Sequence, residues 1–191
     1  LLAIWSALLR PELDVRAITT VTWPSDGRAR FIKRLLRYLN RTDIPVAAGM
    51  QYPLRELSAR EVEALHNLDV SMNHRAFAEP HDERDAPDAV DAIDLIIRTV
   101  EQHPGDIILC CIAPLTNIAT ALQRKPEITK QIKAIYLMGG EIAQFRGEHN
   151  IAYDAAAAHI VFGAGVPIAM GTWSVTREFR LLSLIHISEP T

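Results

Sequence analysis

Three adjacent polar residues, Glu148, His149 and Asn150, carry the side chains of this sequence best suited to hold a polar ligand. A carboxylate accepts hydrogen bonds, an imidazole can donate or accept one, and a carboxamide does both. Residues two apart in an extended segment project to the same side, so Glu148 and Asn150 could grip the paired hydroxyls of a sugar. Gly139 and Gly140 lie shortly before them and let backbone approach a ligand closely. Spacing alone also fits a solvated surface loop.

An alternation of helices and strands must position these residues. Apolar residues recur with helical spacing or form short continuous runs between turn signals, and Pro11 ends the first helix. The expected helices cover residues 1–10, 27–40, 58–66, 87–103, 116–124 and 154–162, and the expected strands cover 14–22, 44–48, 107–112, 134–138 and 166–170. Residues 67–85 show no periodicity and predict a long surface excursion that could act as a lid. Four histidines are expected on the surface: His66, His74, His81 and His103.

The spacing of these elements predicts the fold class. Apolar strands separated by helices at crossover length are typical of an α/β fold with a Rossmann-like open sheet, mostly parallel, covered by helices on both faces. Ligands of such sheets bind where the strands end at their carboxyl side. The segments that follow strands are residues 22–26, 113–117, 139–150 and 172–176.

Composition limits the possible partners. The chain has 191 residues, is 49% hydrophobic, and carries 20 basic against 23 acidic residues for a net charge of −3. Such a balance argues against nucleic acid or an anionic membrane as a partner and favours a small, roughly neutral ligand. No apolar run reaches the length of a membrane span. Adjacent Cys110 and Cys111 would point to opposite faces of a strand, so we expect no bridge between them and a reducing, cytoplasmic environment.

Common catalytic signatures are missing from this sequence. It contains no nucleophile elbow, P-loop, zinc-ligand spacing or Gly-x-Gly-x-x-Gly fingerprint. The residues by themselves predict an α/β domain with a crevice for a small molecule.

Five blocks of the sequence, taken in order, resemble the inosine-uridine preferring nucleoside hydrolases. Together they cover about residues 1–180, and their order makes the resemblance specific. The blocks are residues 11–21 (PELDVRAITTV), 42–54 (TDIPVAAG, then PL), 113–119 (APLTNIA), 135–140 (IYLMGG) and 148–168 (EHNIAYD, then GVPI).

This resemblance implies calcium-dependent hydrolysis of the N-glycosidic bond of a ribonucleoside to ribose and free base, in a cytoplasmic dimer or tetramer that serves nucleoside catabolism and salvage. Glu148 and Asn150 match the family's ribose-binding Glu-Phe-Asn, with His149 in place of the aromatic residue. Met138 matches a methionine at the floor of the ribose pocket. Ile112 falls where the family offers a main-chain carbonyl to the calcium ion.

The same resemblance indicates that the chain is an internal piece of a larger domain. The family's Asp-rich motif, which supplies the catalytic base and calcium ligands, would lie before Leu1, and its later His-Asp pair would lie after Arg180. No candidate catalytic residue therefore falls within the chain, and we expect the chain alone to be inactive. Residues 1–181 would form a partial nucleoside hydrolase domain, and residues 182–191 a non-native read-through tail.

Departures from the family pattern suggest a divergent subgroup. Thr22 and Trp23 stand where the family usually has Gly-Asn, with Asp26 as a candidate replacement, and Ser174 stands where it usually has aspartate. These changes leave open a non-catalytic homologue that binds or senses nucleosides. An unrelated Rossmann-like nucleotide-binding domain is a third possibility, which the missing glycine fingerprint weakens.

Overall fold

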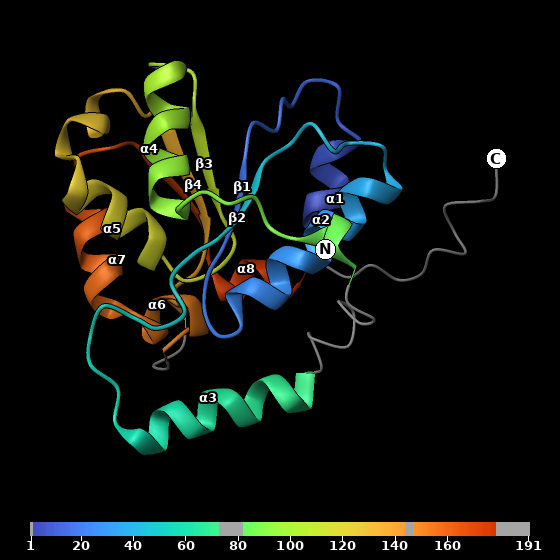
Figure 1. The fold of residues 1–191 in the computed structure, drawn as a ribbon. Helices are drawn as coiled ribbons and strands as arrows, with labels where there is room; N and C mark the ends of the chain where they lie inside the picture. Colours follow the sequence, from blue (N-terminus) through green and yellow to red (C-terminus); the bar gives the residue numbers. More distant parts are fainter. Residues whose placement is uncertain (1, 73–81, 144–146, 179–191) are drawn as a thin grey trace, which may run out of the picture.

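The computed structural model describes residues 2–72, 82–143 and 147–178, with the side chains of 68–72 left out. Within these ranges the expected alternation of helices and strands is present (Figure 1). In chain order the elements are α1 (Leu2–Leu8), β1 (Ile18–Thr20), α2 (Ser25–Tyr38), β2 (Val46–Ala48), α3 (Ala59–Met72), η2 (Glu83–Asp85), α4 (Ala92–Gln102), β3 (Ile108–Cys111), α5 (Thr116–Arg124), η3 (Pro126–Lys130), β4 (Ala134–Met138), α6 (His149–Tyr153), α7 (Ala155–Phe162), β5 (Ile168–Gly171) and α8 (Trp173–Thr176).

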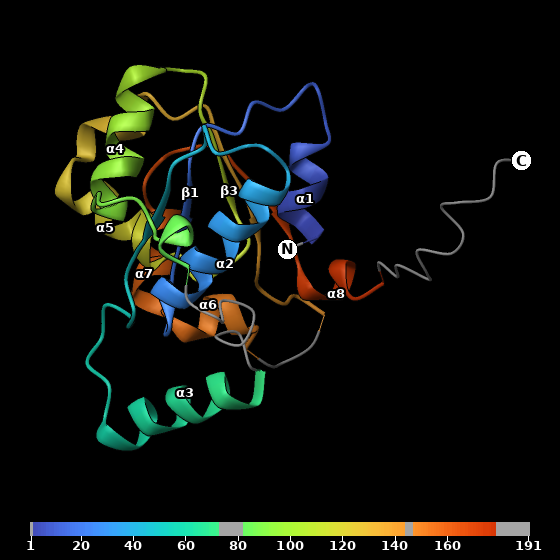
Figure 2. The ribbon, with the colours of Figure 1, turned by 45° about the vertical axis from the view of Figure 1, so that its right-hand side comes forward.

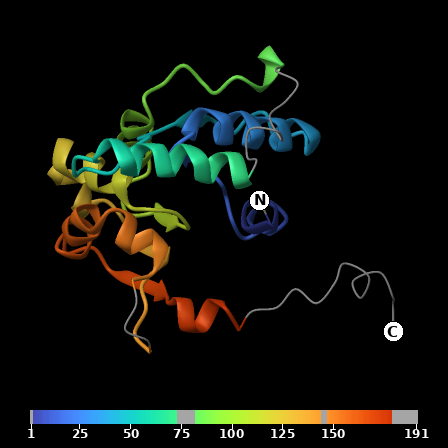
Figure 3. The same cartoon turned by 90° about the horizontal axis from the view of Figure 1, so that it is seen from below.

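All described strand pairs are parallel, which confirms the predicted α/β class. They form a two-stranded sheet of order β1-β2 and a three-stranded sheet of order β3-β4-β5. Cys111 pairs with Leu137, and Met138 pairs with Gly171, so β3, β4 and β5 end together at their carboxyl side. In Figure 1 this edge points downward, with α6 and α8 beside it, and Figure 3 looks onto it from below.

Helices α4, α5 and α7 bury one face of the three-stranded sheet. Their apolar side chains join those of β3 and β4 in the largest core, around Val100, Ile135 and Val161. The opposite face of the three-stranded sheet is less covered. There the described part of the chain leaves Ile108, Cys110, Ile112, Tyr136 and Ala169 exposed. Side chains of a strand alternate between faces, so this uncovered face holds every second residue of each apolar run.

Asn117 joins the two sheets at their carboxyl ends. It lies in the first turn of α5 and is buried, with its Nδ2 donating to the carbonyl oxygen of Thr20, 2.8 Å away. Its Oδ1 accepts from the backbone N–H of Met50 at 2.9 Å. A Cβ on Gly49 would lie 2.4 Å from this side chain, so glycine is required there. The ends of β1, β2 and β3 therefore meet around one amide.

The segment between residues 58 and 85 differs most from expectation. Ser58 and Glu61 form the predicted capping box, with the Ser58 N–H donating to Glu61 at 2.9 Å. The helix it opens runs to Met72, six residues beyond the expected end at His66. Residues 73–81, which include His74 and His81, lie outside the described part, so the lid hypothesis stays a prediction. The next described element is η2, which ion pairs to α2 hold in place.

Asp85 of η2 is buried between two arginines of α2. Its carboxylate accepts from Arg34 Nε at 2.8 Å and from Arg37 Nε at 2.9 Å. Burial alone would raise the pKa of Asp85, but the hydrogen bonds from Arg37 and Arg34 outweigh it and lower the pKa below its ordinary value. The ionised form therefore stabilises the fold, and it ties the end of the excursion to α2.

Replacing Asp85 with asparagine is expected to lower the melting temperature at pH 7 by on the order of 5 °C or more, because two arginines lose a buried anion. Since the folded-state pKa lies below the unfolded one, the contribution is complete above the unfolded pKa of about 4 and is lost as pH falls through the folded value. The two melting curves should thus converge in acid. Asp43→Asn, which breaks the exposed ion pair with Arg41, is the matched control and should change the melting temperature little. A pH-independent difference for Asp85→Asn would contradict this assignment.

Both cysteines are free, as the sequence predicted. Cys111 is buried against the core, and burial raises the pKa of its thiol to about 12. Within the described residues, no helix is both long and apolar enough to span a membrane.

Candidate active site

Glu148 lies at the carboxyl edge of the three-stranded sheet and caps α6. One carboxylate oxygen accepts from the backbone N–H of Asn150 at 2.9 Å. The other accepts from the N–H groups of Gly140 at 2.9 Å and Ile151 at 3.1 Å. An ionised carboxylate has about four acceptor positions, and three are used here. The side chain is thus fixed between the end of β4 and the start of α6, and these donors leave one of its acceptor positions unused.

Asn150 faces the last residue of β4 from the first turn of α6. Its Nδ2 donates to the carbonyl oxygen of Met138 at 3.0 Å and lies 3.4 Å from the Met138 sulfur. Within the described part of the chain no hydrogen bond is recorded to its Oδ1. The three residues expected to bind ribose, Glu148, Asn150 and Met138, are therefore brought together.

The backbone around Glu148 and Asn150 differs from the expected extended segment. Glu148 is extended, with φ −79° and ψ 145°, but α6 begins at His149. The two side chains are therefore not related by the two-residue repeat of a strand. A helix N-terminus leaves backbone N–H groups without helical partners, and the Glu148 carboxylate accepts two of them. Glu148 and Asn150 are therefore close because the Glu148 side chain caps the helix that carries Asn150.

Asp154 is a positioning residue that the sequence did not single out. It is fully buried, and its Oδ1 caps α7 by accepting from the Ala157 N–H at 3.0 Å. Its Oδ2 accepts from the Thr116 hydroxyl at 2.7 Å and from the Leu54 N–H at 2.9 Å. One carboxylate thus connects the segments that follow β2, β3 and β4. Its place as the last residue of the EHNIAYD block, directly before a helix, was the available signal.

Tyr153 closes α6 against the segment after β2. Its hydroxyl donates to the carbonyl oxygen of Gln51 at 3.2 Å. Burial raises the pKa of Tyr153 to about 12, so the hydroxyl keeps its proton and stays a donor at neutral pH. Through this contact α6, which carries Asn150, is fixed to the end of the β1–β2 sheet.

Comparison with known families shows to which family the chain belongs. The sequence model for "Inosine-uridine preferring nucleoside hydrolase" matches residues 1–189. The chain belongs to this family. Membership confirms the resemblance seen in the five blocks and decides against an unrelated nucleotide-binding domain.

Curated members of the nucleoside hydrolase family align with nearly the whole chain. The pyrimidine-specific ribonucleoside hydrolase RihA of Salmonella arizonae is 36% identical over 188 residues, which cover 94% of this chain and 58% of the relative. RihA of Shigella boydii is also 36% identical, over 98% of this chain and 60% of the relative. The chain therefore spans about 58–60% of the length of these relatives.

Solved nucleoside hydrolases share the fold. A purine-preferring ribonucleoside hydrolase from Gardnerella vaginalis superposes with a TM-score of 0.74 at 25% identity, over 94% of this chain and 59% of that one. A plant nucleoside hydrolase gives a TM-score of 0.63 at 26% identity, over 86% and 62% of the respective chains. The α/β architecture is thus that of the family.

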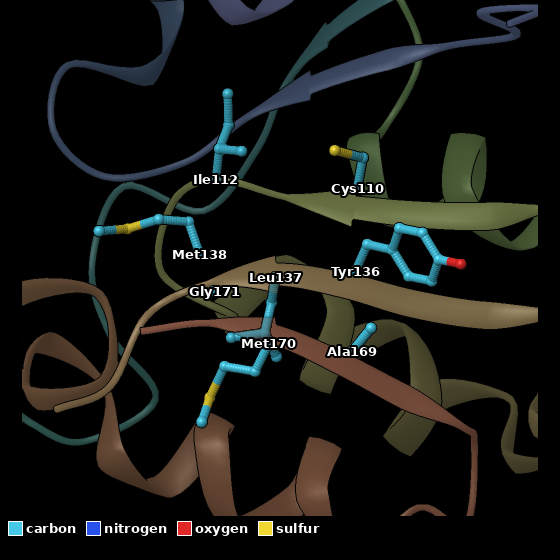
Figure 4. Close-up of a pocket in the computed structure, with 8 residues that line it drawn as sticks. All are labelled: Cys110, Ile112, Tyr136, Leu137, Met138, Ala169, Met170 and Gly171. Atoms are coloured by element: carbon cyan, nitrogen blue, oxygen red, sulfur yellow. The ribbon is translucent and has the colours of Figure 1, made fainter. Parts of the chain in front are cut away.

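Ile112 and Met138 border the same open hollow, which lies on the uncovered face of the three-stranded sheet near the carboxyl ends of its strands. This hollow has a volume of about 410 Å³, and residues of β3, β4 and β5 line it (Figure 4). Ile112 directly follows β3 and exposes 48% of its surface. Its carbonyl is the group expected to bind calcium, and that role stays a prediction.

The described residues do not make up a calcium site by themselves. Ca²⁺ takes six to eight oxygen ligands, usually with several carboxylates among them. Within the described ranges no group of three or more His, Cys, Asp or Glu side chains is placed to hold a metal ion. Glu148 and Asp154 already accept three hydrogen bonds each.

Ser174, which stands where the family usually has aspartate, also lies at this edge. It follows β5 in the short helix α8, and its hydroxyl donates to Glu141 in the segment after β4. The pair joins the ends of β4 and β5. His149, the remaining residue of the polar triplet, is exposed, and its ring lies 5.9 Å from that of Tyr153.

Proposed function

We propose that the protein containing this chain hydrolyses the N-glycosidic bond of ribonucleosides, giving ribose and a free base. The proposal is supported by family membership together with one structural observation, the hydrogen-bonded cluster of Glu148, Asn150 and Met138 at the carboxyl edge of a parallel sheet. Ligands of such sheets bind at this edge. The named relatives include a pyrimidine-specific and a purine-preferring enzyme, so membership leaves the base open.

In this proposal Glu148 and Asn150 hold the ribose. The remaining acceptor position of Glu148 and the Oδ1 of Asn150 accept hydrogen bonds from two sugar hydroxyls, and Met138 packs beneath the ring. Positive charge develops on the sugar when a glycosidic bond breaks, and a nearby carboxylate lowers the energy of that state. Because backbone N–H groups fix Glu148 beforehand, no reorganisation is needed during the reaction.

Calcium is part of the proposal on the strength of the family resemblance. The main-chain carbonyl of Ile112 would be one ligand, and the others would come from outside the described residues. A bound calcium ion would supply polarisation of a water molecule and of the ribose hydroxyls. We also propose, from the same resemblance, that the protein is cytoplasmic and forms a homodimer or homotetramer. Light scattering of the purified protein would test the oligomeric state.

The competing candidate is a non-catalytic homologue that binds or senses nucleosides. It is favoured by Thr22, Trp23 and Ser174, which depart from the family pattern at the site edge. Such a protein would bind a nucleoside and release no base.

A nucleoside panel assayed with and without a chelator separates these candidates. For the full-length protein we expect release of free base from inosine or uridine, and loss of that release when calcium is chelated. Base release that survives chelation would overturn the calcium role, and nucleoside binding without base release would favour the sensor. The 191-residue chain alone is expected to release no measurable base, and turnover by it would contradict that expectation.

A further inference from the structure

Helix α6 is too short to fix its own position. It spans five residues, His149–Tyr153, and helices shorter than about 12 residues are marginal on their own. In Figures 1 and 2 it lies beneath the carboxyl edge of the sheet, where it carries Asn150. The Glu148 carboxylate holds its first turn by accepting from the N–H groups of Asn150 and Ile151. The other end of the helix must be held by different contacts.

Two adjacent residues tie the end of α6 to the segment that follows β2. The Tyr153 hydroxyl donates to the carbonyl oxygen of Gln51 at 3.2 Å, and Asp154 accepts from the Leu54 N–H at 2.9 Å. Asp154 also caps α7 and accepts from Thr116, so it holds the core together as well as α6. Within the described ranges, the Tyr153 hydroxyl takes part in its one hydrogen bond alone. Its removal therefore acts on α6 and leaves the buried carboxylate network in place.

The acceptor of the Tyr153 hydrogen bond is itself fixed. The Oε1 of Gln51 accepts from the N–H of Ser25, the first residue of α2, at 3.3 Å. Ser25 is buried, and its hydroxyl donates to the carbonyl oxygen of Gly49 at 2.8 Å. The segments after β1 and β2 thus hold Gln51 from its side chain. Because Gln51 cannot follow the helix, its carbonyl oxygen is a stationary anchor for Tyr153.

The orientation of α6 decides where the carboxamide of Asn150 points. Its Nδ2 donates to the carbonyl oxygen of Met138 at 3.0 Å, at the end of β4. Asn150 and Tyr153 are three residues apart, which is a rise of about 4.5 Å and close to one helical turn. A rotation of the helix at Tyr153 therefore moves Asn150 relative to Met138 and changes the direction of its Oδ1.

We propose that Tyr153 is a positioning residue of the ribose site, whose hydroxyl sets the affinity for ribose by holding Asn150 in place through α6. The inference rests on the proposed function, in which the Oδ1 of Asn150 accepts a hydrogen bond from a ribose hydroxyl. Without the Tyr153 hydroxyl, α6 can rotate about its remaining tether at Asp154, and Asn150 then meets the sugar in several orientations. A contact with a spectator hydroxyl is made equally before and during bond cleavage, so its loss weakens binding and leaves the chemical step unchanged.

Calorimetric titration of the full-length protein with ribose, in the presence of calcium, tests this role. Tyr153→Phe keeps the ring and removes only the hydroxyl, and it should weaken ribose binding by about 2- to 10-fold, the worth of one hydrogen bond. The KM for inosine and uridine should rise by the same factor, with kcat within about twofold of the wild type. Tyr38→Phe, at an exposed tyrosine of α2, is the matched control and should change neither quantity. Circular dichroism should show an intact fold in both variants.

A double-mutant cycle with Asn150→Ala shows whether Tyr153 acts through Asn150. In the Asn150→Ala background the carboxamide is absent, so Tyr153→Phe should weaken ribose binding no further, by less than about twofold. A merely structural role for the hydroxyl predicts equal weakening in both backgrounds. Unchanged ribose affinity in Tyr153→Phe, or the same loss with and without Asn150, would overturn the proposal.

Ribose binding and base release separate this proposal from the hydrolase function. Ribose binding that follows the expected cycle, without base release from any nucleoside, would refute the hydrolysis alone. Base release together with an additive cycle would refute the role of Tyr153 alone. Failure of the wild-type protein to bind ribose would overturn both.

Discussion

Replacing Asp154 with alanine is expected to lower the free energy of unfolding by about 4 kcal/mol, on the order of 10 °C in melting temperature. The carboxylate is fully buried and accepts from Ala157, Thr116 and Leu54. Its removal leaves the buried Thr116 and Ala157 donors and the partly buried Leu54 donor without acceptors, and each buried group of this kind costs about 1–3 kcal/mol. Because these donors come from segments after three strands, the carboxyl edge should also loosen.

Two further variants sharpen this test. Asp154→Asn keeps one carbonyl oxygen that can cap α7. Its free energy of unfolding should fall less than that of Asp154→Ala, because part of the hydrogen bonding survives. Asp106→Ala removes an exposed carboxylate and should leave the melting curve almost unchanged. Chemical denaturation monitored by circular dichroism provides the measurement. A loss below about 1 kcal/mol for Asp154→Ala would show that this carboxylate does not hold the segments together.

Replacing Glu148 with glutamine is expected to reduce kcat/KM of the full-length enzyme for nucleosides by about 10²- to 10³-fold. Glutamine has nearly the same shape, but its NH₂ group would face one or two of the N–H donors from Gly140, Asn150 and Ile151. It also removes the negative charge that, in the proposed reaction, stabilises the positive sugar. The variant therefore loses both the hydrogen bonds that fix the side chain and its negative charge.

Asn150→Ala separates these two causes, because it removes a proposed ribose contact while the Glu148 carboxylate stays. We expect a smaller loss than for Glu148→Gln, mainly through weaker ribose binding. Glu127→Gln, on the exposed surface of η3, is the charge-matched control and should leave kcat/KM within about threefold of the wild type. Steady-state kinetics with inosine and uridine measures all three variants. Wild-type kcat/KM in Glu148→Gln would remove this residue from the site.

The most regular parts of the fold could be predicted from local sequence. Helix α5 and strand β4 have the predicted bounds, because Pro114 and Pro126 bracket the helix, and Lys133 and Gly139 flank the apolar run of the strand. The end of α3 at Met72 was missed by six residues. No glycine or proline stops the helix at His66, and the polar residues that follow show no apolar period, although they are compatible with helix. Polarity was interpreted as a loop signal where it indicated only exposure.

The sequence by itself determined which residues gather at the carboxyl edge. Strand order along the chain, parallel pairing and the five blocks are enough to place Met138 at the end of β4 and Glu148 and Asn150 after it, because parallel strands end at one side of a sheet. Only the tertiary structure decided how these residues are held. The contacts of Asn117 with Thr20 and of Asp154 with Leu54 join residues about one hundred positions apart, and no local pattern encodes such pairs. Likewise, the contact of the His66 ring with Trp23 depends on where α3 lies, which packing between distant segments determines and helical periodicity does not.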